Sequence, residues 1–263
     1  MKKSTLHSTL TTKGLSVGYV TKKSQSRILD NISFDLKKST LTGLIGINGS
    51  GKSTLLRTLS GLQPPLAGTI FLNQKPLTTL DNLTVAKKIS VVLTQENTSK
   101  NLSVSELVGL GRQPYTNWIG TLNKVDLTHI KEALHVTETY TIRHKKCSEL
   151  SDGQLQRVLI ARALAQDTDV MLLDEPLSHL DLHHKASLLK LLASIAHDQN
   201  KTVLFSTHDI EYAIERCDSL IVLHKEGVFM DSPENLIKTD IFSSLFPSKH
   251  ITFNTVQKRF DLE

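Results

Sequence analysis

The stretch Gly46-Ile47-Asn48-Gly49-Ser50-Gly51-Lys52-Ser53-Thr54 decides the fold of this chain, because residues 46–53 fit the pattern G-x-x-x-x-G-K-[ST]. The apolar residues 41–45 precede it and are typical of a strand, while residues 54–62 carry leucines at helical spacing. A strand, a glycine-rich loop and a helix in this order are the context that a phosphate-binding loop requires.

The residue types in this loop suit the binding of phosphate groups. Gly46, Gly49 and Gly51 let the backbone turn so that its N–H groups point inward at an anion. The start of the following helix adds the positive end of the helix dipole. Lys52 can reach the β- and γ-phosphates of a nucleotide, and the Ser53 hydroxyl can bind Mg²⁺. The alternative, a glycine-rich turn that binds nothing, leaves the residues downstream unexplained.

The composition predicts a globular chain with one large domain, or one domain plus a subdomain. Its 263 residues can bury a full core, and 39% hydrophobic with 22% charged residues are ordinary values for such a chain. The longest apolar runs, such as residues 170–173 and 203–205, suit buried strands and are too short to cross a bilayer. No apolar stretch follows the N-terminal lysines, so no secretory signal is expected. Cys147 and Cys217 lie far apart, which favours free thiols in a reducing cytosol over a disulfide or a metal site.

The formal net charge of +5 raises the question of an acidic partner. The lysines form short pairs, such as Lys87-Lys88 and Lys145-Lys146, instead of a tract with interleaved aromatic residues. Nucleic acid is therefore not an expected partner. A position near an anionic membrane surface and a merely solvated basic face explain the charge equally well.

Helical patterns alternate with apolar strands along the chain, which predicts an α/β fold with a parallel core sheet. Before the loop, residues 15–20 and the alternating residues 28–36 are expected to form strands. After it, Pro64 and Pro65 are expected to end the first helix. The further elements expected are strands at residues 68–72, 169–173 and 202–206, and helices at residues 154–166 and 183–199.

Residues 101–148 have a helical pattern and interrupt this alternation. They predict a helical subdomain at about residues 96–150, inserted into a single domain that covers residues 1–263. Residues 1–13 are rich in Thr, Ser and Lys and are expected to form a flexible tail. The mixed pattern of residues 236–263 predicts no particular element.

Several polar segments follow apolar runs downstream of the loop. Residues 170–175 read Val-Met-Leu-Leu-Asp-Glu, so an apolar strand would deliver two carboxylates, Asp174 and Glu175, at its C-terminal end. Gln95 follows the apolar residues 89–93. Residues 150–154 read Leu-Ser-Asp-Gly-Gln, residues 177–181 read Leu-Ser-His-Leu-Asp, and residues 206–209 read Ser-Thr-His-Asp. In their order along the chain, these motifs resemble those of the ATP-binding cassette (ABC) ATPases, over residues 15–227.

The resemblance implies an ABC-type phosphate-loop ATPase with a RecA-like parallel core, an N-terminal antiparallel β subdomain and the inserted helical subdomain. It assigns Mg²⁺ to Ser53, Gln95 and Asp174. Glu175 would act as a general base or position the water that attacks the γ-phosphate, His208 would hydrogen-bond that phosphate, and Lys52 and Gln95 would assist.

The resemblance also implies which residues contact ATP. Tyr19 would stack on the adenine ring, although a core or surface tyrosine is the alternative. The remaining contacts within one chain would come from the loop itself: Gly46, Asn48, Gly49, Ser50, Gly51, Lys52, Ser53 and Thr54.

Residues 150–154 resemble the signature motif of the family. Ser151, Gly153 and Gln154 would then bind the γ-phosphate of an ATP held by a second copy of the chain, in a head-to-tail dimer with twofold symmetry. The family usually has Gly where this chain has Asp152, whose carboxylate we expect to point away from the phosphate. The family also more often has Ala, Gly or Asn at position 179; a metal site formed by His179, His183 and His184 is an alternative reading of these histidines.

Residues 102–115 resemble the corresponding segment of importer ATPases for ferric siderophores, haem and cobalamin, and residues 157–165 and 180–182 agree. This implies the ATP-hydrolysing subunit of an ABC importer, peripheral on the cytoplasmic face of the cell membrane. Its partners would be integral membrane permease subunits, docking near residues 95–115, and indirectly a substrate-binding protein. The ATPase of an ABC exporter, and a soluble ABC ATPase without a transporter, are the alternatives.

Overall fold

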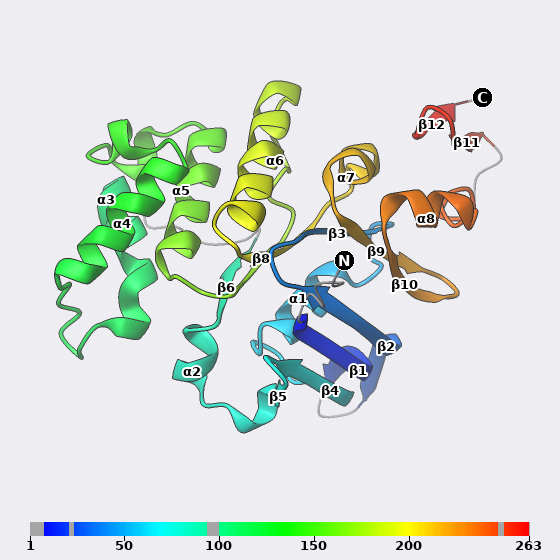
Figure 1. Cartoon of the computed structure of the whole chain (residues 1–263), viewed down its shortest axis with the longest axis horizontal. Coiled ribbons are helices and arrows are strands. Elements are labelled where there is room, and N and C mark those ends of the chain that lie inside the picture. Colours follow the sequence, from blue (N-terminus) through cyan, green and yellow to red (C-terminus); the bar gives the residue numbers. More distant parts are fainter. Residues whose placement is uncertain (1–7, 21–23, 94–99, 247–249, 263) are drawn as a thin grey trace, which may run out of the picture.

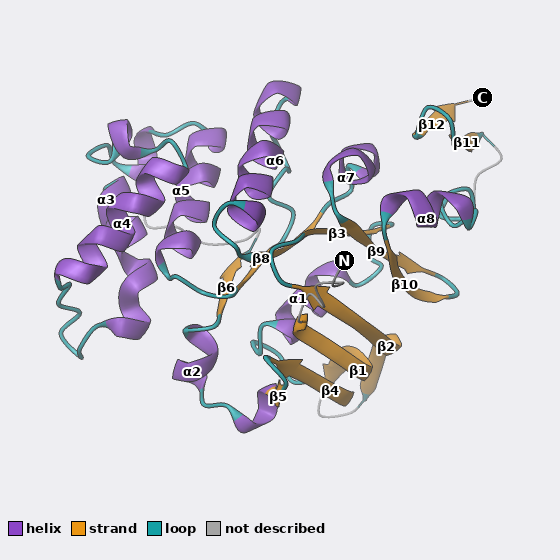
Figure 2. Cartoon of the chain, in the orientation of Figure 1, coloured by secondary structure: helices purple, strands orange, loops and turns teal. Residues whose placement is uncertain are grey.

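The computed structural model describes residues 8–20, 24–93, 100–246 and 250–262. Most of its strands form an N-terminal antiparallel sheet and a central sheet, with most of the helices grouped beside or around the latter (Figures 1 and 2). The antiparallel sheet has the strand order β2-β1-β4-β5, with β1 at Ser8–Val20, β2 at Gln25–Lys37, β4 at Ala67–Leu72 and β5 at Lys75–Pro76.

The central sheet carries the parallel core that the alternation of helices and strands predicts. Its strand order is β10-β9-β3-β8-β7-β6, and all neighbours are parallel except β9 and β10. The strands are β3 (Leu41–Gly46), β6 (Ile89–Val92), β7 (Val170–Leu173), β8 (Thr202–Ser206), β9 (Ser219–His224) and β10 (Gly227–Asp231).

The helices are α1 (Lys52–Leu59), α2 (Asn82–Ala86), α3 (Val104–Gly109), α4 (Lys124–Val136), α5 (Asp152–Ala165), α6 (Leu182–His197), α7 (Ile210–Arg216) and α8 (Pro233–Lys238). The described residues also form the short 3₁₀ helices η1 (Leu77–Thr79), η2 (Leu110–Tyr115), η3 (Tyr140–Ile142) and η4 (Cys147–Glu149). Figure 1 shows α3, α4 and α5 grouped on one side of the central sheet. The predicted insertion at about residues 96–150 thus packs, through α3 and α4, against α5, which begins just after the end of the insertion. In the part of the chain that the structure describes, no helix has the length and hydrophobicity that crossing a membrane requires.

The central sheet is buried on both faces because a hydrophobic layer packs on each face. Successive side chains of a strand point alternately into one layer and the other. On β3, Leu41 and Ile45 belong to one layer, which the helices α3–α7 cover. Leu44 faces the other layer, together with leucines of α1 and apolar residues of β1, β2 and β4. The antiparallel sheet therefore closes one side of the core and fixes the position of α1.

The N-terminal strand begins earlier than its sequence predicts. We expected a strand from residue 15 and a flexible tail over residues 1–13, but β1 begins at Ser8. Leu10 is fully buried and pairs with Leu36 of β2 and Leu72 of β4. Thr12 accepts a hydrogen bond from the Phe34 amide at 3.0 Å through its hydroxyl. The threonines at positions 9, 11 and 12 therefore reflect the strand preference of a β-branched residue.

The first helix ends before the prolines that were expected to end it. Helix α1 stops at Leu59, and the chain then turns at Gly61, whose φ of +77° lies in the left-handed region. The Gly61 amide donates to the Thr58 carbonyl at 3.1 Å, as at a glycine-terminated helix end. Leu62, predicted to lie on the apolar face of this helix, is 63% exposed.

The C-terminal residues form elements that the sequence did not predict. After α8, β11 (Ile251–Asn254) and β12 (Arg259–Leu262) pair as an antiparallel hairpin. Phe253 of this hairpin contacts Phe242, with ring centroids 4.9 Å apart, and Phe260 contacts Phe246 at 5.0 Å. The amide of Phe260 donates to Glu211 of α7 at 2.9 Å. Aromatic contacts and one hydrogen bond thus attach the hairpin beside α7.

A buried ion pair connects the helices of the group formed by α3, α4 and α5. The Arg112 guanidinium donates to Asp126 at 3.0 Å and to the Ala165 carbonyl at 2.8 Å, with side chains only 4% and 1% exposed for Arg112 and Asp126. Although burial opposes it, hydrogen bonds from Asn123 and Arg112 hold the pKa of Asp126 below its usual value. The pair joins η2, α4 and α5.

Substitution of Arg112 by Met should destabilise the chain by about 3–5 kcal/mol, because a buried carboxylate loses its partner. The matched control is Arg27→Met, which removes the ion pair with Asp30 from an exposed position and should cost about 0–1 kcal/mol. Urea unfolding followed by circular dichroism measures both. Equal midpoints for the two variants would contradict the structural role given to Arg112.

Candidate nucleotide-binding site

The candidate site lies where three neighbouring parallel strands end. The loop of residues 46–51 follows β3, Asp174 and Glu175 follow β7, and His208 follows β8 by two residues. Because β7, β8 and β3 are adjacent and run in the same direction, their C-terminal ends share one edge of the sheet. Ligands of open parallel sheets bind at this edge.

The glycine-rich loop leaves the start of α1 open toward the site. Gly49 and Gly51 have φ angles of +79° and +100°, which other residues rarely adopt. Gly51 is the N-cap of α1, and no side chain caps this helix end. The first amides of α1 are thus available to an anion. Asn48 is exposed, and the buried hydroxyl of Ser50 has no hydrogen-bond partner within the described ranges.

Lys52 is held inside this loop by main-chain carbonyls. Its ammonium donates to the Gly46 carbonyl at 3.0 Å and to the Ile47 carbonyl at 3.3 Å, and the residue is 5% exposed. Burial lowers the pKa of Lys52, an effect that the nearby charges of Glu175 and Asp174 partly offset. A buried cation with neutral partners favours the arrival of an anion, because phosphate charge would stabilise the ammonium.

Asp174 links the three strand ends through its carboxylate. Its Oδ1 accepts hydrogen bonds from the Ser53 hydroxyl at 3.0 Å and from the Ser206 hydroxyl at 2.8 Å. The Ser206 hydroxyl also accepts from the Glu175 amide at 2.8 Å. We did not predict a role for Ser206; the only signal is a polar residue at the end of an apolar strand. A carboxylate and a hydroxyl together form the kind of oxygen ligand set that Mg²⁺ prefers.

Glu175 and His208 lie side by side at the edge of the site. Glu175 has a φ of +48°, and its carboxylate accepts from the Ser178 hydroxyl at 3.1 Å. Nδ1 of His208 lies 3.9 Å from Oε2 of Glu175, and these side chains are 48% and 28% exposed. Both groups therefore remain accessible to a substrate.

Tyr19 reaches the same site from the antiparallel sheet. Its hydroxyl hydrogen-bonds with the Thr54 hydroxyl at 2.9 Å, and the residue is 45% exposed. The aromatic ring thus lies next to the start of α1 with part of its surface open.

The predicted signature residues form the start of a helix in the helical group. The Ser151 hydroxyl accepts from the Gln154 amide at 3.3 Å, and the Gln154 side chain accepts from the Ser151 amide at 3.2 Å, which makes a capping box for α5. Among the described residues, no hydrogen bond joins Ser151, Gly153 or Gln154 to the glycine-rich loop, and Figure 1 shows α5 apart from α1. Asp152 lines a cavity of about 230 Å³ together with Asp174, Glu175 and Ser178.

Gln95, which was predicted to bind Mg²⁺ and to assist hydrolysis, lies outside the described residues.

The turn at residues 177–181 and the histidines around it were also singled out in the sequence. The turn at residues 177–181 ends at Asp181, which caps α6 by accepting from the His184 amide at 2.9 Å and also contacts the His184 ring at 2.8 Å. Within the described ranges, no group of three His, Cys, Asp or Glu residues is arranged to hold a metal ion.

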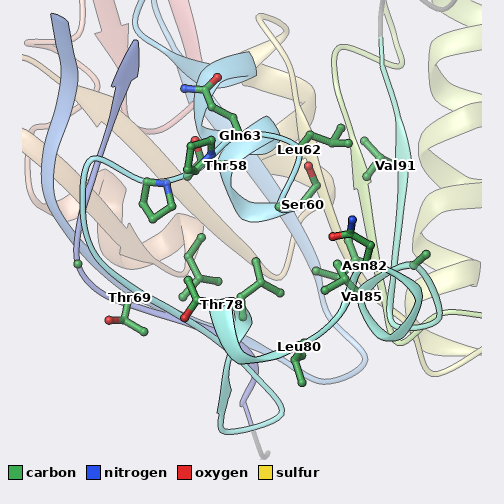
Figure 3. A pocket seen from close by; sticks show the side chains of 18 of the residues that line it. Thr58, Ser60, Leu62, Gln63, Thr69, Thr78, Leu80, Asn82, Val85 and Val91 are labelled. Atoms are coloured by element: carbon green, nitrogen blue, oxygen red, sulfur yellow. The ribbon is translucent and has the colours of Figure 1, made fainter. Parts of the chain in front are cut away.

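A separate apolar groove lies beyond the C-terminal end of α1 (Figure 3). It has a volume of about 850 Å³ and is lined by the turn after α1, by β4, by α2 and by β6. Leu62 lies on its wall and is 63% exposed, and Val85 faces it from α2. We call this cavity the α1–α2 groove.

Comparisons with known proteins identify the relatives of this chain. A family model described as "ABC transporter" matches residues 29–178. The achromobactin transport ATP-binding protein CbrD of Dickeya dadantii is 34% identical over 238 residues, which cover 90% of this chain and 87% of that protein. The iron(3+)-hydroxamate import ATP-binding protein FhuC of Bacillus subtilis is 35% identical over 238 residues, covering 90% and 87%.

The fold matches solved structures of the same kind. The dimeric structure of a bacterial ABC transporter cassette superposes with a TM-score of 0.73 at 28% identity, over 85% of this chain and 98% of that one. The order of the motifs, the strand ends that carry them and these matches lead to one conclusion. The chain belongs to the ABC transporter family, as one of its ATP-binding cassettes.

Proposed function

We propose that this chain is the ATP-hydrolysing subunit of an ABC importer that takes up a ferric siderophore or a similar chelate through separate permease subunits. The names of its relatives support the substrate class, since FhuC is an iron(3+)-hydroxamate import ATP-binding protein and CbrD is an achromobactin transport ATP-binding protein. ATP hydrolysis is supported above all by one observation: Lys52, Asp174 and Glu175 lie close together at one edge of the central sheet. The word import in the name of FhuC supports import over export as the direction of transport for this chain.

The glycine-rich loop holds the triphosphate of ATP in this proposal. The open amides at the start of α1 and the Lys52 ammonium bind the phosphates, and the unpartnered Ser50 hydroxyl gains an acceptor. Asn48 belongs to the same loop and contacts the phosphates, and the Tyr19 ring covers the adenine after its hydroxyl releases Thr54.

The residues present also fit Mg²⁺. The Ser53 hydroxyl and the Asp174 carboxylate already lie 3.0 Å apart and offer oxygen ligands, and Gln95 is the third predicted ligand. When bound, Mg²⁺ would neutralise negative charge on the phosphates.

Glu175 and His208 carry out the hydrolytic step. The Glu175 carboxylate orients a water molecule and takes its proton while the water oxygen bonds to the γ-phosphorus. The bond between the γ-phosphorus and the β,γ-bridging oxygen breaks, so that ADP and phosphate form. His208, 3.9 Å from Glu175, donates a hydrogen bond to the γ-phosphate and keeps the reacting groups together.

A second copy of the chain completes each site. The start of α5 presents the Ser151 hydroxyl, the Gly153 amide and Gln154 at a helix N-terminus, which suits a γ-phosphate on the facing chain. Two chains related by a twofold axis would enclose two ATP molecules in a head-to-tail dimer. The dimeric cassette with a similar fold supports the pairing of two chains.

A helix of the permease docks in the α1–α2 groove, whose wall includes β6, and β6 ends shortly before residues 95–115, where the sequence predicts the docking. This contact holds the chain at the cytoplasmic face of the membrane. The groove is mostly apolar, and the 63% exposed Leu62 lies on its wall, as a helix-docking surface requires. A substrate-binding protein then acts on the permease from the opposite side.

The variant Glu175→Gln should bind ATP like the wild type, form a stable dimer with ATP and hydrolyse it about 10²- to 10⁴-fold more slowly. The amide keeps the shape of the side chain but takes no proton. Phosphate release and gel filtration with ATP measure the two effects. Glu132→Gln, at an exposed position of α4, is the control. Wild-type hydrolysis by Glu175→Gln would show that the general base is another group.

The variant Ser151→Ala should reduce hydrolysis without weakening the binding of ATP to the monomer, whereas Lys52→Ala should weaken that binding directly. Loss of the cap itself costs about 1 kcal/mol of stability. Ser103→Ala is a matched control, because it removes the same kind of capping box from α3. Equal loss of binding and hydrolysis in Ser151→Ala would contradict a site shared between two chains.

Affinity isolation of the tagged chain from gently solubilised membranes tests the transport role. We expect a multi-span permease to be recovered with the wild type and to be lost with Leu62→Glu, since a carboxylate disfavours apolar docking. Val256→Glu, at an 89% exposed position in the distant hairpin, is the control. Recovery of the chain without any permease would contradict the importer proposal and leave the ATPase activity unaffected.

A further inference from the structure

Asp209 occupies a helix N-cap position but does not cap its helix. It precedes α7, and its side chain makes no hydrogen bond to the first amides of that helix. The N-cap residues of the three longest helices, α4, α5 and α6, behave differently, since Asn123, Ser151 and Asp181 each accept from an amide of their own helix. The carboxylate of Asp209 is thus directed by something other than local helix stability.

The partner of Asp209 lies on another helix. The Lys185 ammonium in the first turn of α6 donates to Oδ1 of Asp209 at 2.9 Å, and the two side chains are 18% and 17% exposed. Oδ2 of Asp209 is buried and, within the described ranges, has no hydrogen-bond partner. A buried oxygen without a partner opposes folding, so this placement costs stability that a capping geometry would avoid.

The ion pair connects the two groups that flank the expected position of the attacking water. On one side, Asp209 follows His208 directly in the chain. On the other side, α6 follows the turn that carries Ser178, whose hydroxyl donates to Glu175 at 3.1 Å. Asp181 closes this turn by capping α6. The start of α6 therefore supports Glu175 through the turn and His208 through Lys185.

We infer that the Lys185–Asp209 ion pair is a positioning device for hydrolysis, which holds His208 at the correct place relative to Glu175. The inference rests on the roles proposed for His208 and Glu175. Neither Lys185 nor Asp209 touches the nucleotide; both act through the turn at residues 207–209. The amide of Asp209 donates to the Thr207 hydroxyl at 3.0 Å, which transmits a displacement of Asp209 to the residues around His208.

The test compares Lys185→Met, which keeps most of the side-chain length without the charge, with Lys185→Arg, which keeps a cation. We expect Lys185→Met to lower kcat by about tenfold to a hundredfold with unchanged ATP affinity of the monomer, because small displacements of reacting groups cost this much. Lys185→Arg should retain most of kcat. In Asp209→Asn, adding Lys185→Met should lower kcat no further, since the two residues act as one unit.

Lys201→Met is the matched control. Lys201 pairs with Asp167 at 2.7 Å, its side chain is 17% exposed, and it precedes β8 at the end of the sheet opposite His208. Its substitution should lower the melting temperature in the manner of Lys185→Met and leave kcat unchanged. An equal fall of kcat in both variants would overturn the inference, because it would report a general loss of stability.

His208→Ala separates this inference from the function on which it rests. If His208→Ala is inactive while Lys185→Met has the kcat of the wild type, the positioning role of the ion pair is wrong and the proposed function stands. If His208→Ala hydrolyses ATP like the wild type, the role proposed for His208 is wrong and the inference falls with it.

Discussion

The hydrogen bonds that Asp174 accepts from Ser53 and from Ser206 hold the site together. Ser53 belongs to the helix after β3, Asp174 follows β7 and Ser206 ends β8, so one carboxylate joins three segments far apart in the sequence. The register of the sheet makes this possible, because Leu173 pairs with Phe205 and Leu44 with Ser206. A buried carboxylate requires such partners, and the core that buries the strands therefore also fixes the site.

Local stability is given up at two places around this centre. Helix α1 begins without a side-chain cap, whereas α4, α5 and α6 each have one. Asp209 occupies the N-cap position of α7 without capping that helix, and its buried Oδ2 has no hydrogen-bond partner within the described ranges. Departures from the usual helix rules are expected where a ligand or another segment takes the place of the missing bond. For α1 that ligand is an anion, and for Asp209 the other segment is α6.

The sequence was most informative where a pattern is short-range. The loop around Lys52, the strand before Asp174 and the strand before His208 lie where their motifs and periodicity predicted them. Ser206 was missed because a serine at a strand end carries no signal until the neighbouring strand supplies Asp174. The Thr-rich start of β1 and the C-terminal hairpin were missed because pairing with β2 and contacts with Phe242 decide them, and both are long-range.

The residues that would bind the phosphates are buried, whereas the residues that would carry out hydrolysis are accessible. This difference suggests how hydrolysis is controlled. Asp174 and Lys52 are each 5% exposed and held by several hydrogen bonds, whereas Glu175 and His208 are 28% and 48% exposed and 3.9 Å apart. Binding of the phosphates therefore needs little rearrangement, but hydrolysis needs the accessible residues to be covered and ordered. In the proposed dimer the start of α5 from the second chain provides that cover. Because its Ser151 cap is already formed, closing brings in a preorganised helix end and not a disordered loop.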